Sequence, residues 1–368
     1  MPFAIILTGI RRCSKSTLLV QLTKNIPKFY YLNFDDTRLM DFDINDFDRL
    51  NETFFELYGD SNIYFFDEIQ NIKNWEIFIK TLLDRNKNII LTGSDMSLLR
   101  PDTHLTGRHL NIELFPFSFN EMLKLKNEKA SVENFNDYLL SGGFPEYLKY
   151  RDYRILNELF NDIIQRDIIA KYNIRNIKVI MELALYLLNN SGNEFSYNKL
   201  KNLFNLGSVN TVISFITYLE EAYILFSIPK FDYSLKKQII NNKKIYCVDN
   251  GMLHSNSLSF AEDQGKLLEN LVFITLRKRY RDIFYFKDKF VCDFIIRDKG
   301  KVTNAFQVAY SLNEDNKKRE INGLMSALKA FNLSEGIIFT YNYDDEFILE
   351  DKKIKIMSFW KYLLPAKL

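Results

Sequence analysis

The chain has 368 residues, of which 47% are hydrophobic and 26% are charged, the proportions of a soluble protein with more than one hydrophobic core. Its 49 basic residues nearly balance 47 acidic ones, which excludes a uniformly basic nucleic-acid-coating protein. Its cysteines are too far apart for a C-x-x-C zinc pair or a disulfide framework. Because no apolar run has membrane length and no basic leader is present, we expect a cytoplasmic protein without a membrane partner.

The segment from Ile5 to Leu19 predicts a strand, a phosphate-binding loop and a helix. In the pattern G-x-x-x-x-G-K-[ST], main-chain N–H groups surround the phosphates, Lys reaches the β- and γ-phosphates, and Ser or Thr holds Mg²⁺. The chain follows this pattern except that Ser14 stands in the place of the second glycine. The residues expected to bind ATP are Gly9, Arg12, Cys13, Ser14, Lys15, Ser16 and Thr17, with Ser16 also a Mg²⁺ ligand.

Two further strands end in residues that suit phosphate chemistry. Asn62–Phe66 leads into Asp67 and Glu68, and Asn88–Thr92 leads into Gly93 and Ser94. Ligands of open α/β sheets bind at the carboxyl ends of the strands. Asp67 is therefore expected to hold Mg²⁺, Glu68 to polarise the attacking water, and Ser94 to contact the γ-phosphate or that water. The alternative is that Asp67 and Glu68 cap the following helix and Ser94 is a turn residue.

The chain resembles a large family of prokaryotic, especially archaeal, AAA+-type ATPases with a winged-helix segment and a nuclease-like C-terminal domain. Members of that family carry a short helical segment before the first strand that helps to form the adenine pocket, whereas this chain begins at the strand. The similarity extends nearly from end to end. Its motifs are Thr8–Arg12, Phe66–Gln70, Thr92–Ser94, Gly107-Arg108, Leu114–Ser118, Gly142–Glu146, Arg166-Asp167, Lys244–Gly251, Glu269-Asn270, Asp293-Phe294 and Gln307-Val308.

The element pattern predicts an α/β fold with four parts. Residues 1–118 alternate strands and helices, which indicates a P-loop NTPase core with a parallel sheet, and residues 119–190 form a helical lid. Residues 191–260 predict a winged helix, and residues 261–368 a nuclease-like α/β domain. The core strands are expected at Phe3–Leu7, Phe29–Phe34, Ile63–Phe66 and Ile89–Thr92. Helices of the lid are expected at Phe119–Lys126, Phe135–Leu140, Ile155–Tyr172 and Ile177–Asn189, and the C-terminal domain is expected to follow the order helix, three strands, helix and strand.

Two interpretations of the winged-helix segment stay open, namely DNA binding and a packing or protein-contact role. Ser196 and Ser208 are expected to cap two helices, and the second helix would direct Val209, Val212, Ile213, Ile216 and Leu219 inward. If the segment binds DNA, the contacts are expected from Lys199, Lys201, Lys236 and Lys237.

The C-terminal segment resembles the core of PD-(D/E)XK nucleases, in which acidic groups hold Mg²⁺ and a lysine supports the attacking water. Carried over by position, the acids are Glu269 and Asp293, the second-strand acid is replaced by Gln307, and the lysine is replaced by Ala309. An amide is a weaker ligand than a carboxylate for a hard cation. We therefore expect a nuclease-like scaffold with a degenerate site and without nuclease activity.

Arg108 is the candidate to reach the γ-phosphate of the same or a neighbouring subunit, and the alternative is a surface pair with an acid such as Glu113. The sequence thus predicts an AAA+-type protein that binds ATP and Mg²⁺, hydrolyses ATP, and couples nucleotide state to its C-terminal segments. The partners considered are DNA, another protein and a second copy of the chain. The alternatives are a nucleotide-responsive scaffold without turnover and an ATP-gated DNA endonuclease.

Overall fold

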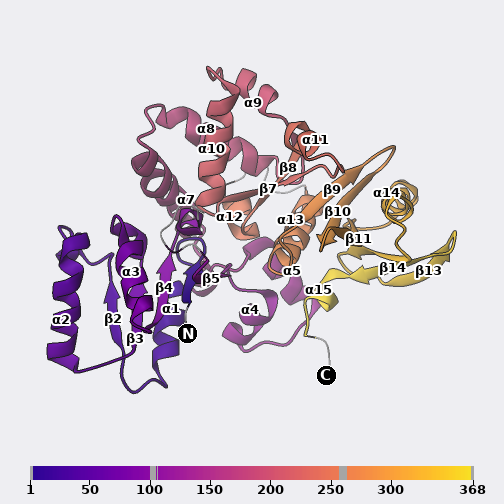
Figure 1. Ribbon diagram of the computed structural model, residues 1–368. Coiled ribbons are helices and arrows are strands. Elements are labelled where there is room, and N and C mark those ends of the chain that lie inside the picture. The colour runs from indigo at the N-terminus through magenta and orange to yellow at the C-terminus, as the bar shows by residue number, and fades with distance from the viewer. Residues whose placement is uncertain (1–2, 100–104, 106, 257–262, 366–368) are drawn as a thin grey trace. The chain divides into compact units, whose positions relative to one another are not determined.

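The computed structural model describes residues 3–99, 105, 107–256 and 263–365 (Figure 1). The chain divides into two compact units: Met1–Phe115 with Glu221–Tyr223, and Pro116–Glu220 with Ile224–Leu368. The predicted boundary between residues 260 and 261 lies outside the described residues, and the finer division into four domains stays a prediction. Within the described residues, no helix combines the length and the apolar character needed to cross a membrane.

The first unit is built on a five-stranded sheet in the order β2-β3-β4-β1-β5, and all of its strand pairs are parallel. The four core strands predicted from sequence are confirmed. The strands are β1 (Ala4–Thr8), β2 (Tyr30–Asn33), β3 (Ile63–Asp67), β4 (Asn88–Gly93) and β5 (His109–Glu113). The helices are α1 (Lys15–Thr23), α2 (Phe47–Tyr58) and α3 (Trp75–Asp84), with short 3₁₀ segments η1 (Thr37–Leu39), η2 (Ile44–Asp46), η3 (Ile69–Asn71) and η4 (Met96–Leu99).

Alternate strand residues give this sheet two apolar faces. Ile6 and Phe66 pack in one cluster with Phe47 of α2 and Phe78 of α3, whereas Leu7 and Phe65 pack with Leu19 of α1. Because both faces are covered, the strands can be almost continuously hydrophobic. Because all of the strand pairs are parallel, the carboxyl ends of the strands lie at one edge of the sheet.

The sequence did not predict the edge strand β5. In β5 three residues, His109, Asn111 and Glu113, are polar and partly exposed, and Leu110 and Ile112 between them are about half exposed. Such a strand lacks the apolar run by which the central strands are recognised.

The second unit begins with helices, most of which were predicted. α4 (Phe119–Lys126) and α8 (Ile177–Asn189) have the predicted bounds, and α5 (Val132–Ser141) is longer than predicted. A predicted helix over 155–172 consists of α7 (Arg154–Asp162) followed by a π-helical segment, η5 (Ile163–Ala170). The short helix α6 (Pro145–Tyr150) follows the Gly142-Gly143 break.

Next comes a small three-stranded sheet in the order β6-β8-β7 with antiparallel pairs. As predicted, Ser196 and Ser208 accept hydrogen bonds from the main-chain N–H groups of Lys199 and Thr211. The prediction for Ile213 is wrong: its side chain is 38% exposed, and Phe215 is buried on the same helix. The elements are β6 (Glu194–Phe195), α9 (Tyr197–Leu203), α10 (Val209–Glu221), β7 (Leu225–Pro229), α11 (Leu235–Ile240), β8 (Lys243–Cys247) and α12 (Asn250–Ser255).

The rest of the second unit is a mixed six-stranded sheet in the order β13-β14-β12-β11-β10-β9. The predicted sequence of one helix, three strands, a helix and a strand is confirmed, and two further strands follow it. Leu324 and Leu328 of α14 pack against the sheet, and Phe273 of α13 contacts Phe294 of β10. The elements are α13 (Gln264–Arg277), β9 (Ile283–Lys287), β10 (Val291–Asp298), β11 (Lys301–Val308), α14 (Lys317–Ala330), β12 (Glu335–Thr340), β13 (Asp345–Leu349), β14 (Lys352–Ser358) and α15 (Phe359–Tyr362).

Candidate nucleotide site and the acidic pair of the second unit

The loop between β1 and α1 depends on Gly9. Its φ is +152°, and a Cβ atom at this position would lie 2.1 Å from the carbonyl oxygen of Leu114. Leu114 in turn donates its main-chain N–H to the carbonyl of Thr8 at 2.7 Å. The turn after β1 is therefore packed against the main chain of the residue that follows β5, and no side chain fits there.

Ser14, the residue in the place of the second glycine, adopts the left-handed conformation with φ 78° and ψ 24°. Arg12 also has a positive φ, at 61°. Left-handed backbone is strained for residues other than glycine. The thiol of Cys13 is buried against the Leu114 carbonyl, and burial raises its pKa. Cys13 could therefore contribute to an anion site only through its main chain.

Lys15 lies within the loop as the first residue of α1, and its side chain is 4% exposed. Its ammonium donates hydrogen bonds to the carbonyls of Gly9 at 2.9 Å and Ile10 at 3.1 Å, and lies 4.0 Å from Glu68 Oε1. Ser16 and Thr17 are exposed in the first turn of the helix. A helix N-terminus with a lysine beneath it is suited to bind phosphate oxygens.

Asp67 and Glu68 follow β3 at the same edge of the sheet. Asp67 is fully buried and accepts hydrogen bonds from Thr92 Oγ1 and, at 3.3 Å, from the hydroxyl of Tyr31. Burial and the nearby Asp67 raise the pKa of Tyr31 to about 12, so Tyr31 remains a donor. Sequence reasoning missed Tyr31 and Thr92. Thr92 could have been found from the parallel pairing of Phe66 with Leu91. This pairing places the next residues of the two strands, Asp67 and Thr92, side by side.

The carboxylate of Glu68 is held by two neighbours. Ser94 Oγ lies 2.9 Å from each of its oxygens, and Gln70 Nε2 donates to Oε2. Ser94 was predicted to contact a phosphate or water, and its observed partner is Glu68. Among the described residues, Gln70 Oε1 is buried without a hydrogen-bond partner. Gln70 is the last residue of the sequence motif Phe66–Gln70, but sequence reasoning assigned no role to its side chain.

These residues fit a Mg²⁺-bound nucleoside triphosphate. No donor from the described part of the chain reaches the buried oxygen of Gln70, whose amide nitrogen bonds Glu68, and an ordered water there could supply one. Lys15 and the N-terminus of α1 would hold phosphates, Ser16 and Asp67 offer oxygen ligands that Mg²⁺ prefers, and the bound ion would neutralise phosphate charge. Glu68, fixed by Ser94, would orient water.

Arg108 lies at the opposite end of the sheet. It precedes β5, and the parallel pairing of Ala4 with His109 places it beside the start of β1, whereas Gly9 follows the end of β1. Its guanidinium forms an ion pair of 2.5 Å with Asp84. The prediction that Arg108 serves the phosphate loop of its own chain is therefore wrong, because a five-residue strand separates them. A role in a neighbouring chain stays a prediction.

The four lysines proposed for DNA lie on two helices. Lys199 and Lys201 belong to α9, and Lys236 and Lys237 belong to α11, where Lys237 is 3.7 Å from Asp232. The sequence of α10, the second helix of the predicted winged-helix segment, contains no lysine or arginine. Contacts of basic side chains with DNA phosphates would therefore come from α9 and α11 and not from α10.

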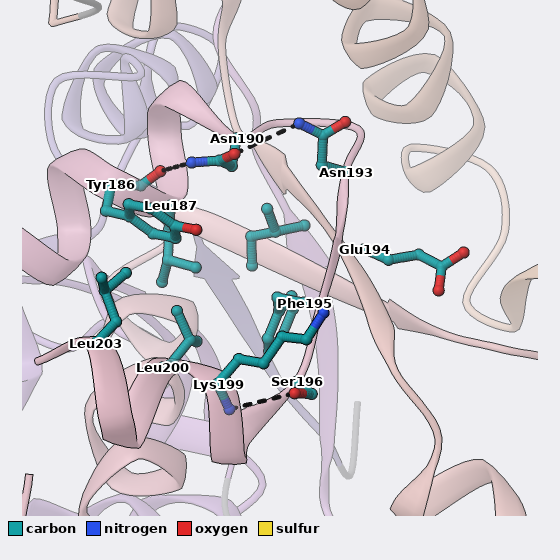
Figure 2. A pocket seen from close by; sticks show the side chains of 11 residues that line it. Tyr186, Leu187, Asn190, Asn193, Glu194, Phe195, Ser196, Lys199, Leu200 and Leu203 are labelled. Carbon is teal, nitrogen blue, oxygen red and sulfur yellow. Dashed lines mark hydrogen bonds between the residues drawn. The ribbon is translucent and has the colours of Figure 1, made fainter.

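Lys199 also borders an open pocket between α8, β6 and α9 (Figure 2). Leu187, Phe195 and Leu200 form apolar parts of its wall, and the amide of Asn193 donates to Asn190 Oδ1 at 3.4 Å on the polar side. The predicted catalytic residues do not line it.

The nuclease-like site is organised differently from the expectation. Glu269 of α13 and Asp293 of β10 do converge, but the ammonium of Lys244 from β8 lies between them, 2.9 Å from an oxygen of each. Gln307 does not complete a metal site, because its amide accepts from the Asp293 main-chain N–H and donates to Glu320. Lys244 belongs to the sequence motif Lys244–Gly251 but was given no role at this site, and it is 6% exposed.

Comparison with known proteins gives matches over most of the chain. Residues 2–123 match the family described as an AAA domain, and residues 132–263 match a domain of unknown function (DUF8612). The uncharacterized protein MJ1544 of Methanocaldococcus jannaschii is 36% identical over 395 residues, which cover 98% of this chain and 88% of that protein. An uncharacterized protein of Haemophilus influenzae is 27% identical over 336 residues, with coverages of 85% and 84%.

The Walker-type ATPase PABY2304 of Pyrococcus abyssi aligns with a TM-score of 0.43 and 16% identity, over 69% of this chain and 91% of that one. A structure of Drosophila ORC bound to DNA aligns with a TM-score of 0.25 and 12% identity, over 71% and 91% of the chains.

Proposed function

Because the chain belongs to the family of the archaeal protein MJ1544 and has an AAA-type ATP-binding domain at residues 2–123, we propose that this domain hydrolyses ATP with Mg²⁺. The observation that carries the proposal is the position of Glu68. Its carboxylate lies 4.0 Å from the loop lysine, Lys15, and is fixed by Ser94 at the carboxyl edge of a parallel sheet. A fixed carboxylate beside a phosphate loop is suited to orient the attacking water.

Two variants test binding and turnover separately. Lys15→Ala removes the ammonium within the loop, so Mg-ATP binding should fall strongly. Glu68→Gln should bind Mg-ATP like the parent protein and lose turnover, since the amide cannot act as a base but leaves Asp67 in place. Equal ATP affinity in Lys15→Ala and the parent would refute the site. Binding by the parent without turnover would favour the nucleotide-responsive scaffold instead.

We further propose that the nucleotide state of the first unit controls the second unit, and that the second unit contacts DNA through phosphate contacts. Four lysines on α9 and α11 support DNA contact: Lys199, Lys201, Lys236 and Lys237. A winged-helix role for this segment belongs to the same proposal. Phosphate contacts do not distinguish between DNA base sequences, and the affinity of a protein that binds DNA through them falls steeply as the salt concentration rises.

Mobility shifts at low salt with double-stranded, single-stranded and branched DNA test this interaction. Changing Lys236 and Lys237 together to Glu should weaken binding to every sequence about equally. A matched control changes Lys317 and Lys318, an exposed adjacent pair at the start of α14, to Glu. The absence of any complex, or an equal loss in the control, would count against the DNA interface and leave the protein-contact alternative.

A further inference from the structure

The centre of the second unit contains a lysine between two carboxylates from distant parts of the chain. Lys244 Nζ lies 2.9 Å from Glu269 Oε1 and 2.9 Å from Asp293 Oδ1. The lysine comes from β8, and the acids come from α13 and β10. The side chains of Lys244, Glu269 and Asp293 are 8%, 18% and 10% exposed, so water screens their charges only weakly.

Neighbouring donors hold both carboxylates in place. The hydroxyl of Tyr246 donates to Glu269 Oε1 at 2.7 Å, and the main-chain N–H of Val308 donates to Asp293 Oδ2 at 3.1 Å. Burial alone would lower the pKa of Lys244, but Asp293 and Glu269 outweigh it and raise the pKa well above its usual value. The lysine therefore remains an ammonium ion, and the acidic pair already has its cation.

We propose that the Lys244 ammonium occupies the cation position between Glu269 and Asp293 and thereby excludes a divalent metal ion. Shortening the Lys244 side chain would then convert the two carboxylates into a divalent-cation site. Among the described residues, no cluster of three or more His, Cys, Asp and Glu could hold a metal. Mg²⁺ sites in proteins commonly use one or two carboxylates and keep several waters as ligands, and Mn²⁺ accepts the same ligand types. The proposal is independent of ATP hydrolysis.

The energetics favour such a conversion. Removing one partner of a buried ion pair leaves an uncompensated charge, and here it would leave two carboxylates side by side. Lys244→Ala should therefore be destabilised without metal. A divalent cation restores the missing charge and uses the oxygens that faced the ammonium, so binding and stability become linked.

The experiment measures Mn²⁺ binding to the nucleotide-free full-length chain by equilibrium dialysis and electron paramagnetic resonance. Lys244→Ala should bind one Mn²⁺ more than the parent, and Mn²⁺ should raise its thermal midpoint by several degrees without raising that of the parent. Adding Asp293→Asn should abolish the gain. Lys243→Ala is the matched control, because Lys243 is the neighbouring lysine of the same strand and donates to the Ile239 carbonyl at 3.0 Å.

Two results would overturn the proposal. One is a parent protein that binds Mn²⁺ at this pair, with binding lost in Asp293→Asn. The other is a folded Lys244→Ala protein that gains no Mn²⁺. If Lys244→Ala does not fold without metal, refolding in Mn²⁺ but not in NaCl of equal ionic strength supports the proposal, and failure of Mn²⁺ to refold both Lys244→Ala and Lys244→Ser refutes it.

Discussion

The hydroxyl of Ser94 lies 2.9 Å from both carboxylate oxygens of Glu68 and links the ends of two neighbouring parallel strands. Together with Gln70, which donates to Glu68 Oε2, Ser94 holds the carboxylate of Glu68, whose backbone is left-handed with φ 52°. Ser94 is thus a positioning residue in the proposed reaction, because it acts on water only through Glu68.

Ser94→Ala should lower kcat for ATP hydrolysis by roughly 10- to 100-fold, since a misplaced base loses much of its effect. The KM for ATP should change little, because Lys15 and the loop remain intact. Steady-state kinetics over a range of ATP concentrations separates the two effects. Thr81→Ala removes an exposed hydroxyl from α3 of the same unit and serves as the control. A rise in KM without a fall in kcat would assign Ser94 to binding instead.

Ser14→Gly should stabilise the first unit and raise turnover. With φ at 78°, Ser14 is held in a conformation that glycine adopts freely, and relief of this strain is worth about 1 kcal/mol. Thermal unfolding and ATPase assays measure the two effects. The control is Asn86→Gly, because Asn86 is another residue of the first unit with a left-handed backbone, with φ 57°, and it follows α3. This control should gain some stability and no turnover. Unchanged turnover in Ser14→Gly would mean that the loop has adapted to serine.

Local patterns predicted much of the fold and of the nucleotide site. Central strands can be recognised in the sequence by their apolar runs. The order of the parallel strands then places Asp67, Glu68 and Ser94 at one edge of the sheet. The missed features depend on contacts across long sequence distances. Lys244 pairs with Glu269 and Asp293, which lie 25 and 49 residues away in the sequence. Local sequence patterns do not predict that the three elements carrying these residues pack together. The edge strand β5 lacks an apolar run because His109, Asn111 and Glu113 alternate with its apolar residues.

Asp249 should make stability depend on pH between about 4 and 6. Its carboxylate is buried at the start of α12 and accepts main-chain hydrogen bonds from Gly143 at 2.7 Å and Met252 at 3.1 Å. Burial raises its pKa from 3.8 to about 6, and these hydrogen bonds offset part of that rise. A folded-state pKa above the unfolded value gives stability that is complete below about pH 4 and lost as the pH rises through 6, by about 3 kcal/mol.

The comparison with Asp249→Asn isolates this effect, because the amide does not titrate. From pH 4 to pH 7, the urea midpoint of the parent should fall relative to that of Asp249→Asn. Asp263→Asn removes the capping carboxylate of α13, whose side chain is 52% exposed, and controls for the loss of a helix cap. Parallel pH profiles for the parent and Asp249→Asn would contradict the assignment.

Arg108 should be structural. Its ion pair with Asp84 is partly exposed, with side-chain exposures of 33% and 58%, so Arg108→Ala should lower the free energy of unfolding by less than about 1 kcal/mol. ATP turnover should equal that of the parent, because the arginine lies at the end of the sheet opposite its own phosphate loop. Asp84→Ala should give the same small loss of stability.

A mixing experiment decides whether a neighbouring chain uses Arg108. The informative outcome is an inactive Arg108→Ala protein whose ATP turnover is restored when it is mixed with inactive Lys15→Ala. In the mixture, the intact phosphate loop of the Arg108→Ala chain would be completed by Arg108 of the Lys15→Ala chain. That outcome would contradict the structural role and show that the active species is an oligomer. Full turnover by Arg108→Ala alone, at every protein concentration, would confirm that Arg108 only joins the start of β5 to the end of α3.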